Sequence, residues 1–336
     1  MNTFVKFAVP ASLAVLLAAC GQSGTSTLPG GGVSSQSQAH QSMTQTQSES
    51  KLADGLQLGR VEMPIRGKQQ AKRDLSGLLN WGGGAVQHSP TIYVVYWGWV
   101  DKANNKKADP NDLQPTLNKF LSSVGGSNWL STVTQYYDKT GDINSPTGQF
   151  ENASGKLACG TTKKALKGSN CIYDKTPPSS DPTDGEIQQE AAKLVKVFGA
   201  NANASYVVQT PYGHNTNGFG TEWCAYHGAF TSGGVIIAYT NLPYMPEAGQ
   251  SCGAGFVNNP GTLDGVTIVE GHELAETQTD PGANYSGWGG NDGEIGDICA
   301  WDSTTSNQPI NGNTFPVQPL YSDVASACTL TGPNGP

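Results

Sequence analysis

The feature that most limits how this chain can fold is the stretch of residues 91–99, TIYVVYWGW. It is a dense run of β-branched and aromatic residues directly after Pro90, and such a run is typical of a strand buried inside a sheet. A buried strand needs other strands beside it and further elements packed on its faces. The rest of the chain must supply those elements.

Apolar residues recur at intervals of three and four in four later segments, which are residues 111–124, 128–138, 184–199 and 263–280. This spacing predicts helices with one apolar face. Asp184 is expected to cap the third helix and Gly199 to end it, while Pro281 ends the fourth.

Further strands are predicted for residues 205–210 (SYVVQT) and 233–244 (GGVIIAYTNLPY), and short strand-like pieces follow near residues 315–321. The order of strand, helices, strands, helix and loop predicts an α/β domain of the α+β kind. Its mixed, partly antiparallel sheet should be packed with helices.

The cysteines predict that this fold is stabilised by disulfides. Setting Cys20 aside leaves an even set, Cys159, Cys171, Cys224, Cys252, Cys299 and Cys328. An even set in an exported protein favours disulfides, and no CxxC spacing supports a thiolate metal site. Six cysteines allow about 15 connectivities. The sequential pairing, 159 with 171, 224 with 252 and 299 with 328, is predicted because each loop is then short.

The N-terminus reads as an export signal. Residues 1–19 carry Lys6 near the start and an apolar run that ends in small residues. The sequence LAAC resembles a bacterial lipobox, which predicts that cleavage leaves a lipidated Cys20 as the membrane anchor. No acidic retention signal follows at Gly21, so an outer-membrane lipoprotein is expected in a diderm host. A plain secretory signal and a secreted protein are the alternative.

Composition divides the remainder into three parts. Residues 20–55 are rich in Gly, Ser, Thr and Gln and are predicted to be a disordered tether. Residues 56–77 are a mixed linker, and residues 78–336 form a single globular domain. The net charge of −8 and the lack of a basic patch argue against a nucleic-acid partner. Substrates and partners are therefore expected in the cell envelope or outside the cell, and the oligomeric state is left open.

Residues 268–281, IVEGHELAETQTDP, carry half of a zinc-protease signature. His272 and Glu276 are four residues apart, so on a helix they lie on one face within reach of one ion. In the H-E-x-x-H signature the intervening Glu takes a proton from zinc-bound water, which makes Glu273 the candidate catalytic base. Zinc accepts the carboxylate of Glu276 in place of the second histidine. The added negative charge should weaken activation of the water.

A third ligand is available downstream in NDGEIGDICAW, which contains Glu294 and Asp297. The separation resembles that of thermolysin-like gluzincins, and the resemblance implies that Glu294 binds zinc and Asp297 orients His272. The two roles could also be reversed. His227 and His214 are weaker rivals for a place among the ligands.

Two other interpretations compete with zinc. HExxE also arises by chance in amphipathic helices, where its carboxylates are simply solvated. Against this, acidic residues are concentrated here in a chain with 14% charged residues, and unpaired carboxylates that repel one another are relieved by a cation. Calcium is the alternative metal, because GGNDGEIGD is rich in oxygen ligands on glycine hinges.

Three stretches together resemble the phosphate-induced, or exordium-like, proteins of plant cell walls and their bacterial relatives. They are PTIYVVYWGWV, LNKFLSSVGGSNWLSTVTQYYD and ELAETQTDPGANYSGW with the later EIGDICAW. The resemblance implies an exported protein associated with the cell wall, without a defining catalytic mechanism. The residues matching HELAETQTDP are a departure, since plant members typically keep its framework without the His-Glu pair.

Two functions are thus expected from the sequence. The first is a lipid-anchored zinc metallopeptidase, in which His272, Glu276, Glu294 and Asp297 form the metal site, Glu273 is the base and a peptide or cell-wall polymer is the substrate. The second is a noncatalytic exordium-like envelope protein that binds polysaccharide or a protein partner through surface Trp and Tyr residues.

Overall fold

A seven-stranded mixed sheet with helices on both faces forms the centre of the fold, as the sequence predicts. The computed structural model describes residues 57–68, 79–99, 106–152 and 158–333. The order of the strands in the sheet is β1-β9-β10-β8-β3-β7-β6. Strands β10, β8, β3, β7 and β6 run parallel to one another, whereas β9 pairs antiparallel with both β10 and β1. The sheet strands are β1 (Gln57–Pro64), β3 (Thr91–Trp97), β6 (Gly160–Thr161), β7 (Cys171–Asp174), β8 (Ala204–Gln209), β9 (Trp223–Ser232) and β10 (Val235–Leu242).

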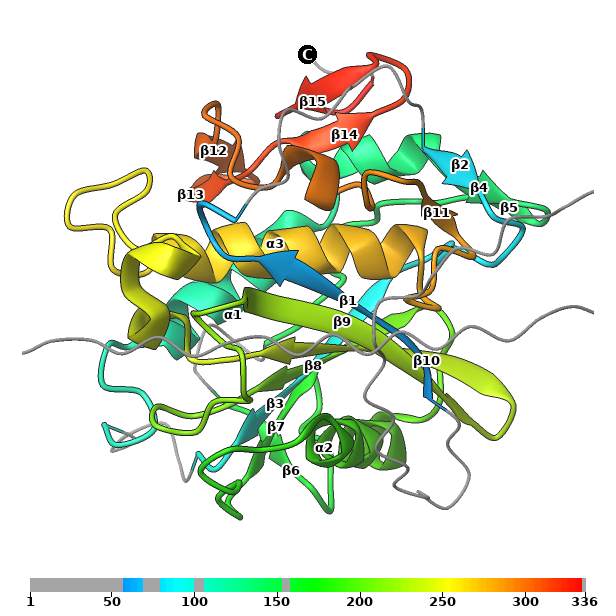
Figure 1. Cartoon of the computed structure of the whole chain (residues 1–336). Coiled ribbons are helices and arrows are strands. Elements are labelled where there is room, and N and C mark those ends of the chain that lie inside the picture. Colours follow the sequence, from blue (N-terminus) through cyan, green and yellow to red (C-terminus); the bar gives the residue numbers. More distant parts are fainter. Residues whose placement is uncertain (1–56, 69–78, 100–105, 153–157, 334–336) are drawn as a thin grey trace, which may run out of the picture. The chain divides into compact units, whose positions relative to one another are not determined.

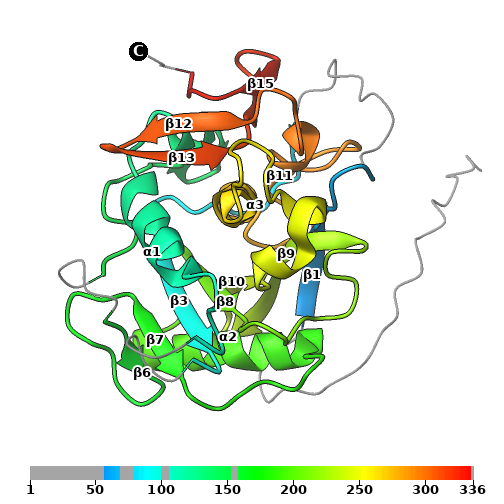
Figure 2. The same cartoon turned by 90° about the vertical axis from the view of Figure 1, so that its left-hand side faces the viewer.

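Helices α1 (Leu113–Val124) and α3 (Asp264–Thr279) cover one face of the sheet, and α2 (Asp184–Phe198) covers the other (Figures 1 and 2). Short pairs surround them: β2 (Asn80–Trp81) with β11 (Trp288–Gly289), β4 (Tyr137–Asp138) with β5 (Gly141–Asp142), β12 (Ser306–Ile310) with β13 (Asn313–Val317), and β14 (Leu320–Ser322) with β15 (Ala327–Thr329). The 3-10 turns are η1 (Leu130–Gln135), η3 (Met245–Cys252) and η4 (Asp297–Cys299).

Strand β3 is buried on both faces, which confirms the expectation for residues 91–97. Val94 packs in the core shared with α1 and α3, and Val95, the next residue, packs in the core shared with α2. Successive side chains of a strand point to opposite faces, so a strand between two helical layers needs apolar residues at every position.

Helix α3 lies between the sheet and the hairpins β12–β13 and β14–β15 (Figure 2). Every one of its 16 residues is buried. The sequence pattern predicted a helix here, but one with a single apolar face and an exposed polar face. Because the C-terminal hairpins cover the side that would otherwise face solvent, its histidine and its glutamates also lie in the interior.

The local signals explain the ends of α2. Thr183 is the N-cap and forms a capping box with Glu186, so the cap lies one residue before the expected Asp184. Gly199 ends the helix with a φ of 94°, a conformation that favours glycine.

One predicted helix is wrong, and two strands were not predicted. Residues 128–138 form the 3-10 turn η1 and strand β4 instead of an α-helix, because Thr132 and Thr134 donate side-chain hydrogen bonds back to carbonyls three residues earlier. Strand β9 was not predicted, since its run of fully buried residues has no polar alternation. The segment expected as a linker contains β1, which pairs with β9 along the sheet edge.

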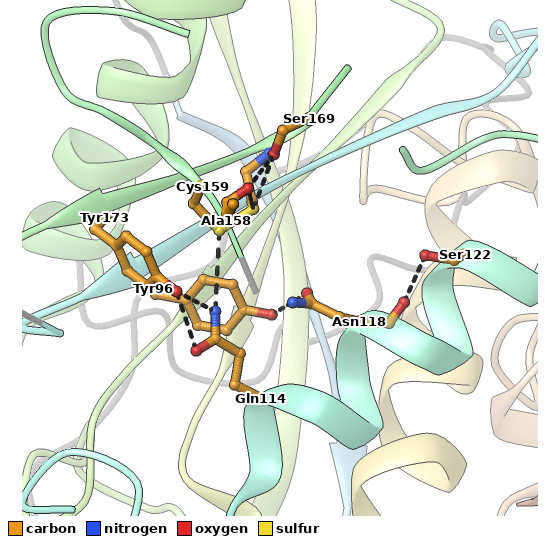
Figure 3. Close-up of a disulfide and its surroundings, with 9 residues drawn as sticks. Tyr96, Gln114, Asn118, Ser122, Ala158, Cys159, Ser169 and Tyr173 are labelled. Carbon is orange, nitrogen blue, oxygen red and sulfur yellow. Dashed lines mark hydrogen bonds between the residues drawn. A yellow bond between two sulfur atoms is a disulfide. The ribbon is translucent and has the colours of Figure 1, made fainter. Parts of the chain in front are cut away.

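Three disulfides form with the predicted pairing: Cys159–Cys171, Cys224–Cys252 and Cys299–Cys328. Figure 3 shows the first of them beside Gln114 of α1, which donates a hydrogen bond to the Tyr173 hydroxyl at 2.8 Å. Cys224 lies in β9 and Cys299 lies in η4, so the other two disulfides fix elements on either side of α3.

The expected signal, the lipidated Cys20 and the tether fall outside the described residues. Within the described ranges, none of the helices combines the length and the apolar character needed to cross a membrane.

Asp138 should make stability depend on acid pH. Its carboxylate accepts hydrogen bonds from the Val86 and Thr140 amides. Burial alone would raise the pKa of Asp138, but the hydrogen bonds from Thr140 and Val86 outweigh it and lower the pKa to about 2. A depressed pKa stabilises the fold above the ordinary value of 3.8, and this stabilisation is lost as the pH falls through about 2.

We therefore expect Asp138→Asn to lower the free energy of unfolding by about 1 kcal/mol at pH 6. Its difference from wild type should shrink towards zero near pH 2. Urea midpoints of both proteins at the two pH values test this, and a difference that does not change with pH would contradict it.

Candidate metal centre

Three segments bring the candidate ligands together inside the protein. Helix α3 carries His272, Glu273 and Glu276, β9 carries His227, and the segment that leads into η4 carries Glu294 and Asp297. The first five have no exposed surface, and Asp297 is 6% exposed. All five residues that the sequence proposed for this site therefore lie in one buried cluster, together with His227.

His227 lies among three carboxylates. Its Nδ1 is 3.3 Å from Oε2 of Glu273 and 3.3 Å from Oε2 of Glu276. On the other side of the ring, Nε2 is 3.5 Å from Oε2 of Glu294. We call His227, Glu273 and Glu276 the β9 triad, because their donor atoms lie within 4.8 Å of one another.

His272 lies at a second group of donors. Its Nε2 is 3.1 Å from Oε1 of Glu276 and 3.7 Å from Oδ1 of Asp297. His272, Glu276 and Asp297 also have donor atoms within 4.8 Å of one another, and we call them the loop triad. Glu276 belongs to both triads.

Two features of the chain after α3 hold its acidic residues in place. The Asp280 carboxylate accepts backbone N–H groups from Asn284 at 2.9 Å, Tyr285 at 2.6 Å and Gly287 at 2.7 Å. Further on, the Asp297 amide donates to Oε1 of Glu276 at 3.0 Å. The returning chain is thus hydrogen-bonded to the end of α3 and to a ligand.

Gly296 lets this segment approach the centre closely. A Cβ atom at this position would lie 2.6 Å from Nδ1 of His272 and 2.9 Å from Oε1 of Glu276. The φ of Gly296 is −83°, which any residue can adopt. Glycine is therefore required here for space and not for backbone conformation.

Many donor atoms of the centre are buried without a hydrogen-bond partner among the described residues. They are Nε2 of His227, both ring nitrogens of His272, Oε1 of Glu273, Oε2 of Glu276 and both carboxylate oxygens of Glu294. A buried polar atom without a partner costs about 1–3 kcal/mol, and more when it is charged. So many unpartnered donor atoms in one place are typical of a metal-binding site.

The electrostatics of the centre lead to the same conclusion. Burial would lower the pKa of His272, but the Glu276 carboxylate outweighs it and raises the pKa to about 9. Burial would raise the pKa of Glu276, but His272 and His227 lower it to about 2. The same histidines also act on Glu294 and Glu273, but there the effect of burial is larger and the pKa of each carboxyl group stays raised. The histidines therefore do not offset the effect of burial on Glu273 and Glu294.

A divalent metal fits these donors. With metal–ligand bonds of about 2.0–2.1 Å, neighbouring tetrahedral ligands lie about 3.3–3.4 Å apart. The separations of 3.1, 3.3 and 3.7 Å within the triads lie close to that value. Each triad also contains one imidazole, which suits zinc, whereas calcium prefers oxygen ligands alone.

The structure separates the remaining candidates. His214 lies away from the cluster, with Nδ1 2.8 Å from the Ser179 carbonyl oxygen. Asp297 belongs to the loop triad with His272, while Glu294 faces His227 and not His272. The sequence analysis ranked His227 too low as a candidate ligand. The signal that could have raised its rank is a single histidine within an otherwise apolar run, WCAYHGAF.

The centre is closed to solvent. Pockets of about 300 and 320 Å³ lie elsewhere, one beside Pro115 and Phe315 and the other beside Asn215 and Glu247, and neither is lined by a ligand candidate. Tyr285, close enough to the centre to feel its carboxylates, is 46% exposed. The nearby Asp297, Glu294 and Glu276 carboxylates add to the effect of burial in raising its pKa.

Comparisons of this chain with family models, with curated proteins and with solved structures found no match. The expected place in the exordium-like family therefore stays a prediction.

Proposed function

We propose that this chain is an exported metal-binding protein whose buried centre binds zinc. The observation that carries the proposal is the concentration of buried donor atoms without hydrogen-bond partners on His227, His272 and Glu294. The three disulfides support export, because such bonds persist in oxidising compartments. The burial of the candidate ligands favours a stabilising role, because a large substrate has no direct access to them.

Metal analysis of the purified, disulfide-bonded protein tests this proposal. We expect at least one zinc ion per chain in wild type and a clear loss of zinc in His227→Gln. His214→Gln is the matched control, because it changes the same residue type outside the centre and should keep the wild-type content. A folded wild-type protein without metal, after dialysis against zinc, would exclude the proposal even if His227→Gln does not fold.

Hydrolysis of peptide bonds is a second candidate function. One observation favours it: Oε2 of Glu273 faces His227 while its Oε1 has no partner among the described residues, so that oxygen is free to accept a proton. Bound zinc supplies a water of lowered pKa in enzymes of this class. The burial of the centre ranks this function second, since a substrate could reach the ligands only after part of the chain moved aside.

Glu273→Gln tests the hydrolytic function. The variant should keep most of its zinc, because the amide oxygen can still act as a ligand, and should lose casein or peptide cleavage by about 100-fold or more. Equal cleavage by variant and wild type would rule out Glu273 as the base. Absence of cleavage by zinc-loaded wild type would remove peptide hydrolysis as a function.

A further inference from the structure

The donor atoms of the centre fall into two sets, and a single ion cannot be coordinated by both sets at once. Within each triad the donors lie within 4.8 Å of one another, and among the described residues no set of this kind contains both histidines. Two ligands of one ion with bonds of about 2.1 Å lie at most about 4.2 Å apart. One ion can therefore occupy one triad only.

Glu276 joins the two sets through different oxygens. Its Oε2 is 3.3 Å from Nδ1 of His227, and its Oε1 is 3.1 Å from Nε2 of His272. We propose that the centre binds two divalent ions, one in the β9 triad and one in the loop triad, with the Glu276 carboxylate bridging them. Ions in such two-metal sites lie about 3.5–4 Å apart.

Charge balance supports two ions over one. Four buried carboxyl groups belong to the triads or face His227, those of Glu273, Glu276, Glu294 and Asp297, while the buried Glu270 lies outside both triads. With neutral histidines and all four groups ionised, one divalent ion leaves two negative charges on them, whereas two divalent ions leave none. Because an uncompensated buried charge is costly, the second ion removes a penalty.

The arrangement also gives Glu294 a role. If Nδ1 of His227 binds an ion, Nε2 carries the ring proton, and Oε2 of Glu294 lies 3.5 Å away, a contact that must shorten to become a hydrogen bond. A carboxylate on the far side of a metal-bound imidazole fixes the orientation of the ring and strengthens it as a ligand. Glu294 is therefore a positioning residue for His227.

This inference rests on the proposed zinc-binding function, but it does not require hydrolysis. Three protein ligands for each ion leave one coordination position, which solvent fills in sites of this kind. The β9 triad uses Oε2 of Glu273 as a ligand and leaves its Oε1 free.

Metal stoichiometry is the first test. Metal-free wild-type protein titrated with zinc should take up two ions per chain, and Asp297→Ala, which removes the ligand oxygens altogether, should take up one. Asp292→Ala is the matched control, because it removes a carboxylate from the same segment but belongs to neither triad, and it should still bind two. One ion in wild type would overturn the two-ion centre and leave zinc binding intact, whereas no ion would overturn both.

Electron paramagnetic resonance of the manganese-loaded wild type gives an answer that depends on no variant. Two Mn²⁺ ions bridged by Glu276 are exchange-coupled and should give a multiline spectrum at full loading. Addition of less than one equivalent should give mostly the six-line spectrum of isolated ions. A six-line spectrum at every loading would overturn the proposal.

Discussion

Removing zinc from the purified protein is expected to lower its melting temperature by about 8–16 °C. Ligands that bind only the folded state stabilise it by about 4 kcal/mol when their concentration is a thousand times the dissociation constant. The metal-free centre also retains buried carboxylates that too little positive charge compensates. Scanning calorimetry with and without a strong chelator, and without reductant so that the disulfides stay intact, measures the change.

Restoring zinc after the chelator has been removed should restore the original melting temperature. Calcium at the same concentration should restore much less, because each triad includes an imidazole nitrogen. A melting temperature that is the same with and without chelator, in protein shown to have lost its metal, would contradict a stabilising role for the centre.

The second large effect is expected from Gly296→Ala. The new methyl group would overlap the His272 ring and the Glu276 carboxylate, which together supply two of the three ligands of the loop triad. We expect the free energy of unfolding to fall by about 1–3 kcal/mol, as for other overpacked sites, and the loop triad to lose its ion. Urea unfolding and metal analysis of the same preparation measure both effects.

Gly290→Ala is the matched control for this variant. No atom lies within 4 Å of the position that its Cβ would take, and its φ is outside the left-handed region. Its free energy of unfolding should stay within about 0.5 kcal/mol of wild type, with full metal content. Equal effects of the two substitutions would show that the close approach of Gly296 does not matter.

The part of the centre that lies on α3 could be predicted from the sequence because its geometry is local. His272 and Glu276 share a helix face whatever surrounds the helix. Glu294 and Asp297 follow soon after on the same stretch of chain, so their proximity was also inferable. Their roles depend on how the backbone at Gly296 packs against His272, and no local pattern encodes that contact.

His227 could not be placed from the sequence with the same certainty. Its position depends on which strand lies under α3, and the sheet order β1-β9-β10-β8-β3-β7-β6 decides that. The same order places β1 beside β9, which is why a segment with the composition of a linker joins the sheet. The disulfide pairing was accessible because neighbouring cysteines along the chain also meet in space.

The burial of the β9 triad has a consequence for the kinetics of metal exchange. Since His227, Glu273 and Glu276 have no exposed surface, an ion bound by them can leave only during a transient local opening of the chain around the centre. The rate of loss should then level off as the chelator concentration rises, at the rate of that opening. An ion acquired during folding would be retained for as long as the protein stays folded, even where free zinc is scarce.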